Sequence, residues 1–324
     1  MFDRDGGGSD HGGMTPADLL DRLFAPMSPD LATGDDLRGF LGRWGPGAAA
    51  GAEPGAFDRL VRTALHAGDR LTAGAAGHQA AIRRLFPETP DAAVTAFCVS
   101  EDQGPRPSAI RTRLTPSGAG FVLNGSKRWG SMAPLADLLY VAASIGEQDG
   151  RNQLRMVRVP AGSPGLALDP APYAAYQGHM PIADLTLVDV AVPADAILPQ
   201  DAYVAFIKPF RLVEDVYGTA ATQIALLRLG RVHGWPQEVL EDLTALILQA
   251  HAVSGTPMDR PADVVLMSAY FRASEALWSR LGPAWEPVPP DVRAGWRPET
   301  GTLGVAARAR ETRRQTAWAA LAPR

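Results

Sequence analysis

Apolar residues recur at helical spacing through the first part of the chain. Helices are predicted wherever this spacing holds, over residues 15–24, 35–44, 56–68 and 76–85. The first begins at Thr15 and Pro16, and a threonine cap followed by proline is a typical helix start. We therefore expect a small helical domain over residues 14–93, preceded by a glycine-rich disordered tail over residues 1–13.

The period changes to strand-like alternation in the middle of the chain. Strands are predicted over residues 94–98, 121–125, 138–143, 154–159 and 185–192. The strand at 121–125 is expected to run into a turn at Asn124-Gly125. Several short strands with no long helix between them predict a β-barrel or β-sandwich domain over residues 94–201.

Helical spacing returns beyond residue 202. Helices are predicted over residues 206–231, 236–253, 261–281 and 301–321. The resulting order predicts an α+β protein with an N-terminal helical domain, a central β-barrel or sandwich, and a C-terminal helical bundle over residues 202–324.

Composition narrows the class of protein. A chain of 324 residues with 46% hydrophobic and 20% charged residues is long and apolar enough for a sizeable core. The net charge of −4 disfavours nucleic-acid binding, and no apolar run reaches the roughly 18 residues of a membrane helix. One cysteine, Cys98, excludes an internal disulfide, and no secretory signal is visible, so we expect a cytoplasmic protein.

Searches for common catalytic motifs leave two stretches of interest. GxSxG and HExxH are absent and the six histidines have no ligand spacing, so no metal site is expected. Residues 97–101 close a strand, and residues 124–131 combine a turn, two cations, an indole and a hydroxyl. These groups suit a planar heteroaromatic cofactor, but on chemistry alone a hairpin turn with a half-buried tryptophan and solvated basic residues is the favoured explanation.

The two stretches, in this order, resemble the acyl-CoA dehydrogenase family. The resemblance rests on Ser100-Glu101-Asp102, Ile110-Arg111-Thr112, Asn124 to Ser131, Pro164-Gly165-Leu166, and Leu185 to Leu198. It implies the family fold and a flavoprotein that uses FAD to desaturate an acyl-CoA or acyl-carrier thioester between its α and β carbons. The positions that would contact the flavin ring are Val99, Ser100, Trp129 and Ser131.

The resemblance also implies substrate residues and a base. Glu101, Arg106 and Arg211 would lie near the acyl thioester. The family's two positions for the catalytic glutamate are occupied here by Phe210 and Thr300. Neighbouring carboxylates, Glu214 and Glu299, are therefore the candidate catalytic bases.

Three functions remain open. The chain lacks the family's Arg-x-Gln-Phe-Gly motif for the FAD pyrophosphate, and both its helical parts are short. It is an active homodimeric or tetrameric dehydrogenase, a subunit that shares FAD with a full-length family member, or a redox-silent reuse of the fold as a cyclase, isomerase or binding protein. An active homo-oligomer is expected to purify yellow, and a shared-site subunit to need its partner.

Overall fold

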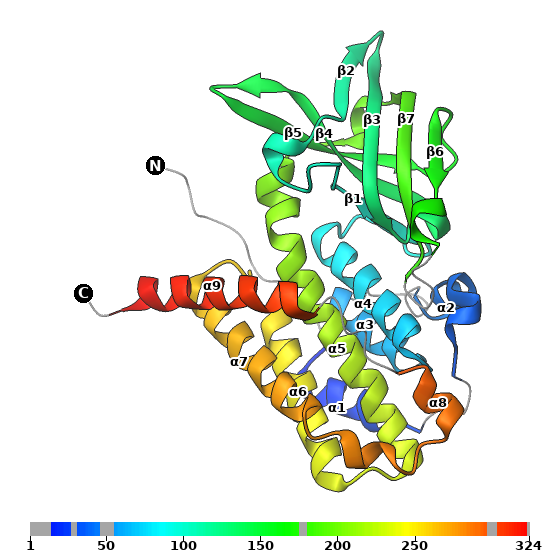
Figure 1. Cartoon of the computed structure of the whole chain (residues 1–324), viewed down its shortest axis with the longest axis vertical. Helices are drawn as coiled ribbons and strands as arrows, with labels where there is room; N and C mark the ends of the chain where they lie inside the picture. The colour runs from blue at the N-terminus through cyan, green and yellow to red at the C-terminus, as the bar shows by residue number, and fades with distance from the viewer. Residues whose placement is uncertain (1–13, 27–30, 46–54, 175–179, 297–302, 323–324) are drawn as a thin grey trace.

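A β-domain lies at one end of an elongated helical body (Figure 1). The structure is a computed structural model that describes residues 14–26, 31–45, 55–174, 180–296 and 303–322. Its order of helices, strands and helices confirms the predicted architecture. No described helix is long and apolar enough to cross a membrane.

The described helices before the sheet are α1 (Pro16–Phe24), α2 (Leu37–Trp44), α3 (Ala56–Ala64) and α4 (Arg70–Leu85). Of these, α1, α2 and α4 begin at side-chain caps, whereas α3, which follows Gly55, begins without one. The Thr15 hydroxyl accepts the Asp18 N–H at 3.2 Å, which confirms the predicted cap of α1. Helix α4 begins earlier than predicted because the Asp69 carboxylate caps it, accepting the Thr72 N–H at 2.8 Å. The predicted tail at residues 1–13 lies outside the described residues.

The strands of the described chain form one eight-stranded sheet in the order β6-β7-β3-β2-β4-β5-β8, with β1 paired to β4. They are β1 (Thr95–Cys98), β2 (Arg113–Ser117), β3 (Gly120–Ser131), β4 (Leu138–Gln148), β5 (Arg151–Pro160), β6 (Leu166–Asp169), β7 (Ile182–Val192) and β8 (Ile197–Leu198). The β1–β4 pairing is parallel, whereas β3–β7 and β4–β5 are antiparallel.

The predicted turn at Asn124-Gly125 is wrong. Strand β3 continues through it, and the pairing with β7 shifts register between Leu123 and Gly125. Gly125 has a φ of 148°, and a Cβ there would lie 2.6 Å from the Cα of Thr112. A bulge at a glycine therefore replaces the turn and lets β3 carry its last residues beyond the hairpin.

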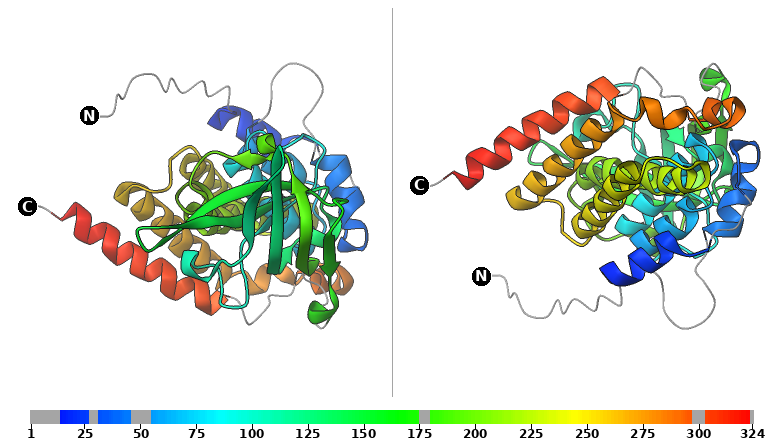
Figure 2. Two further views of the ribbon diagram at one scale, coloured as in Figure 1. Left: turned by 90° about the horizontal axis from the view of Figure 1, so that it is seen from above. Right: turned by 90° about the horizontal axis from the view of Figure 1, so that it is seen from below.

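The helices after the sheet are α5 (Lys208–His233), α6 (Gln237–Ser254), α7 (Pro261–Trp278), α8 (Pro290–Ala294) and α9 (Leu303–Leu321). A π-helical turn at Tyr203–Ile207 leads into α5, which runs from the sheet through the helical body (Figure 1). Helix α9 packs against α7 on the outside of the molecule (Figure 2). The Arg310 guanidinium lies 4.9 Å from the ring centre of Phe271 and fixes part of this contact.

Three apolar clusters hold these layers together. One runs through helices from both ends of the chain, and a second lies within the sheet. The third joins the sheet to α4 and to the start of α5, where Phe86 stacks between Tyr140 at 3.8 Å and Phe206 at 4.6 Å. The two helical segments thus share one core, while the boundaries at residues 93 and 201 stay a prediction.

Helices α4 and α5 approach most closely at a pair of glycines. A Cβ on Gly77 would lie 2.7 Å from the Cα of Gly218, which is backbone and cannot rotate away. At Gly74, three residues earlier on the same helix, no described atom lies within 4 Å of such a Cβ. The separation of α4 and α5 therefore depends on the missing side chain at Gly77.

We expect Gly77→Ala to lower the free energy of unfolding by about 1–3 kcal/mol, because the added methyl forces two packed helices apart. Gly74→Ala, the matched control on α4, should instead gain about 0.5–1 kcal/mol from helix propensity. Urea unfolding of both variants measures the difference. Equal effects at the two positions would contradict the close approach.

Candidate functional site

The two stretches singled out in the sequence lie side by side. The loop that follows β1 meets the second half of β3, where the Arg128 N–H donates to the Ser100 carbonyl at 2.8 Å. The Lys127 ammonium donates to the Val99 carbonyl at 3.3 Å and to Glu101 Oε1 at 2.7 Å. Backbone and side-chain bonds therefore join the segments that carry the predicted flavin-contacting residues.

A buried ion pair forms the centre of this junction. Lys127 is fully buried, and the Glu101 carboxylate also accepts the Arg111 N–H at 2.6 Å, the Thr112 N–H at 3.0 Å and the Thr112 hydroxyl at 2.8 Å. Burial acts to raise the pKa of Glu101, but the ammonium of Lys127 and these donors outweigh it and hold the pKa below its usual range. The predicted substrate residue Glu101 is thus engaged by protein donors.

The sequence analysis noted Lys127 only as a cation in a turn. The structure reveals its burial, because Leu123 and Lys127 are the buried positions of a strand that is otherwise half-exposed or exposed over residues 120–129. Cys98 lies beside this lysine and is buried, which raises the pKa of its thiol to about 12. A thiol with so high a pKa is protonated at neutral pH.

The backbone is strained at the end of β3, which carries the predicted flavin-contacting residues Trp129 and Ser131. Trp129 and Met132 have φ values of 59° and 66°, in the left-handed region, and the β3–β7 register shifts between Lys127 and Gly130. The bulge turns the Trp129 indole outward, 51% exposed, while Ser131 is half-buried two residues further on. A large aromatic surface therefore lies beside a hydroxyl at the end of β3.

A polar rim supports the indole. The backbone N–H of Trp129 donates to the Tyr173 hydroxyl at 2.9 Å, and the ring centres of the two residues are 4.7 Å apart. Tyr173 in turn donates to Asp184 at 2.5 Å, and Arg128 pairs with both Asp184 and Asp102. Burial, with the bond to Asp184, raises the pKa of Tyr173 to about 12, so its proton is fixed on the phenol.

The predicted substrate arginines lie apart from this rim. Arg106 is exposed on the loop between β1 and β2. Arg211 is exposed on α5, where its Nε lies 3.1 Å from Asp215. The structure shows no direct contact between these arginines and the residues around Trp129, within the part of the chain that it describes.

The start of α5 faces α4 and β1 through aromatic side chains. Phe210, which occupies one of the family's positions for the base, has its ring centre 4.2 Å from that of Phe97 on β1. It also meets the His78 ring edge-on at 6.0 Å. Both phenylalanines are half-buried, so this interface reaches the surface close to Val99 and Ser100.

Glu214, one helical turn beyond Phe210, is bonded to a histidine. Its Oε1 lies 2.8 Å from His78 Nδ1, and its side chain is 26% exposed. Burial acts to raise the pKa of Glu214, but the bond and charge of His78, with Arg211, outweigh it and lower the pKa. The sequence analysis missed His78, and the other candidate base, Glu299, lies outside the described residues.

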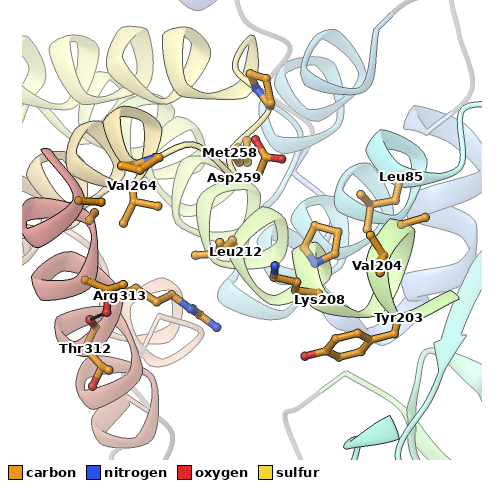
Figure 3. A pocket seen from close by; sticks show the side chains of 17 residues that line it. Leu85, Tyr203, Val204, Lys208, Leu212, Met258, Asp259, Val264, Thr312 and Arg313 are labelled. Atoms are coloured by element: carbon orange, nitrogen blue, oxygen red, sulfur yellow. Dashed lines mark hydrogen bonds between the residues drawn. The ribbon is translucent and has the colours of Figure 1, made fainter. Parts of the chain in front are cut away.

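A separate pocket of about 720 Å³ opens between the start of α5, the start of α7 and α9. Leu212, Met258 and Val264 give it an apolar lining, and the side chains of Lys208 and Arg313 extend into it (Figure 3). Its volume is that of a small-molecule site. None of the predicted flavin-contacting residues lines it.

Comparison with known proteins identifies the β-domain. Residues 96–190 match the family model described as acyl-CoA dehydrogenase, middle domain. A segment of 91 residues, 27% of this chain, is 33% identical to the probable acyl-CoA dehydrogenase FadE10 of Mycobacterium tuberculosis, but it spans only 14% of that protein. Residues 96–190 therefore form a middle domain of the acyl-CoA dehydrogenase type.

Solved structures extend the likeness to the whole fold. Butyryl-CoA dehydrogenase from Megasphaera elsdenii is 15% identical with a TM-score of 0.52, and the match covers 90% of this chain and 94% of that one. The FAD complex of PigA is 13% identical with a TM-score of 0.52, covering 86% and 84%. The N-terminal helices, central sheet and C-terminal bundle are therefore those of the acyl-CoA dehydrogenase fold.

We expect Lys127→Met to lower the free energy of unfolding by about 3–5 kcal/mol, because it leaves the Glu101 carboxylate buried without its counter-ion. Adding Glu101→Gln to that variant should restore part of the loss by removing the stranded charge. Arg280→Met, which breaks the exposed pair with Asp242, is the control and should cost less than about 1 kcal/mol. Urea unfolding that ranks the two single variants equally would contradict the role of the buried pair.

Proposed function

We propose that the chain is a flavin-dependent oxidoreductase that introduces a double bond between the α and β carbons of an acyl thioester. The observation that carries the proposal is the junction of the loop after β1 with the end of β3. It gathers Val99, Ser100, Trp129 and Ser131 at one edge of the sheet, and the Lys127–Glu101 pair holds that edge in place.

The residues at this edge fit a flavin ring. A half-exposed indole supplies an apolar face, and the hydroxyls of Ser100 and Ser131 can bond to ring oxygens and nitrogens. When bound there, FAD supplies the two-electron acceptor that the desaturation needs. In this proposal Glu101 positions the edge through its bond to Lys127 and does not contact the acyl group.

The acyl thioester would bind near the junction of the sheet and the start of α5. Phe97 and Phe210, whose rings contact each other, form an apolar surface there, and the exposed Arg106 and Arg211 are the proposed partners for phosphates of coenzyme A or of an acyl carrier. The carboxylate close to that surface is Glu214, one turn from Phe210, which supports a role for it in removing the α proton.

A second subunit would complete the site. Helix α9 buries Ala317 against the body but leaves Trp318 53% and Leu321 45% exposed. Exposed apolar residues on an outer helix favour association with another copy or with a longer family member. This form of the proposal predicts a chain that is colourless alone and gains flavin with its partner.

Visible absorbance of the purified chain, before and after incubation with FAD and desalting, tests flavin binding. We expect Trp129→Ala to weaken FAD binding about tenfold, because ring stacking is worth roughly 0.5–1.5 kcal/mol beyond buried area. Trp318→Ala removes a tryptophan of similar exposure on α9 and should leave the FAD affinity of the isolated chain unchanged.

If the chain binds no flavin, either alone or with a full-length family member, the proposal is wrong. The redox-silent reuse of the fold is then the function that is left. The apolar Phe210 in a family position for the base is the observation that favours that alternative. Equal effects of the two tryptophan substitutions would mean that FAD, if bound, does not stack on Trp129.

A further inference from the structure

A histidine and a glutamate form a pair across the α4–α5 interface. His78 lies in the middle of α4 with its side chain 3% exposed, and its Nδ1 is 2.8 Å from Glu214 Oε1. Its other ring nitrogen, Nε2, is buried and has no hydrogen-bond partner among the described residues. His78 Nε2 is one of several such buried atoms in the described chain, and it differs from the other ring nitrogens among them because its ring also contacts a carboxylate.

The pair is held rigidly. Gly77 precedes His78, and Gly218 lies one turn beyond Glu214, so the close approach of the two glycines adjoins both members of the pair. The backbones of α4 and α5 cannot separate or slide there without losing this contact. The distance between Nδ1 and the carboxylate is consequently set by helix packing and not by flexible side chains.

The pair also adjoins the proposed reaction site. Phe210 contacts the His78 ring on one side and Phe97 on the other, and Phe97 lies two residues before Val99 on the way to the cofactor edge. Glu214 is partly exposed and both phenylalanines are half-buried, so a substrate near the junction of the sheet and α5 would approach His78 through the Phe210 side.

The contacts of the pair indicate a different role for each of its two residues. With Nδ1 as the donor to Glu214, Nε2 would carry the lone pair of the imidazole ring. The same bond and the charge of His78 lower the pKa of Glu214, so this carboxylate is a weak proton acceptor. The groups that flank Glu214 on α5 are Arg211 and Asp215, whereas β1 brings the apolar Phe97 to this interface.

We infer that His78 is the proton acceptor of this protein and that Glu214 is its positioning residue. The inference rests on the proposed function. The Cα–H bond breaks and its proton moves to His78 Nε2, while the electron pair forms the Cα=Cβ bond. A bound oxidised flavin would supply the acceptor for the hydride of the β carbon, and the proton passes from His78 to solvent afterwards.

Exchange of the α hydrogen in deuterium oxide tests the proton step apart from oxidation. Octanoyl-CoA and octanoyl-pantetheine are incubated with the wild-type chain, with and without FAD, and deuterium at C2 is measured by mass spectrometry. We expect His78→Gln to slow exchange about 100-fold or more, as for loss of a general base. Glu214→Gln should slow it less, because the amide oxygen still accepts the Nδ1 proton.

The outcomes separate the two claims. Exchange without oxidation supports His78 and contradicts the redox function, whereas no exchange by the wild-type chain overturns the assignment of His78. Exchange that survives His78→Gln but not Glu214→Gln makes Glu214 the base and also overturns it. Where a variant fails to fold, nitrogen NMR of wild-type His78 at pH 8 decides: protonated Nδ1 with bare Nε2 supports the inference, and the opposite tautomer overturns it.

Discussion

The buried pair of Lys127 and Glu101 is the interaction on which the cofactor edge depends. Each of its charges is expensive to bury alone, and together with the donors from Arg111 and Thr112 they are satisfied only when β1, β2 and β3 meet in one register. That register sets the bulge after Lys127 and therefore the outward position of Trp129. Loss of either charge would thus alter the cofactor edge as well as stability, although neither group need contact a ligand.

The positions of helices α4 and α5 depend on a different kind of constraint. Gly77 and Gly218 allow α4 and α5 to approach until backbone meets backbone, and the apolar cluster around Phe86 ties both helices to the inner face of the sheet. A polar junction thus aligns the sheet strands, and close packing aligns the helices. Phe97 and Phe210 pack against each other where these two constraints meet.

Much of the fold was predictable because short stretches of the sequence determine it. Thr15 caps a helix through its own hydroxyl, and the alternation of β7 requires no distant partner. The prediction of a turn at Asn124-Gly125 was wrong because a bulge and a turn favour the same residue types. Only the pairing with β7 distinguishes the two structures. The Lys127–Glu101 pair and the His78–Glu214 pair were missed for the same reason. Their members lie 26 and 136 residues apart, and no local pattern joins them.

A phenylalanine in a family position for the base need not remove acid–base chemistry from the fold. Phe210 keeps the His78 ring in an apolar setting, where a hydrogen bond to a carboxylate is stronger than in water. In the proposed arrangement the acidic group would be Glu214, one turn along α5, whose Oε1 faces His78 across the interface. This arrangement demands an α4 that can approach α5 closely, which the glycines provide and a larger residue at position 77 would prevent. In this proposal Phe210, the His78–Glu214 pair and the close contact of the two glycines therefore depend on one another.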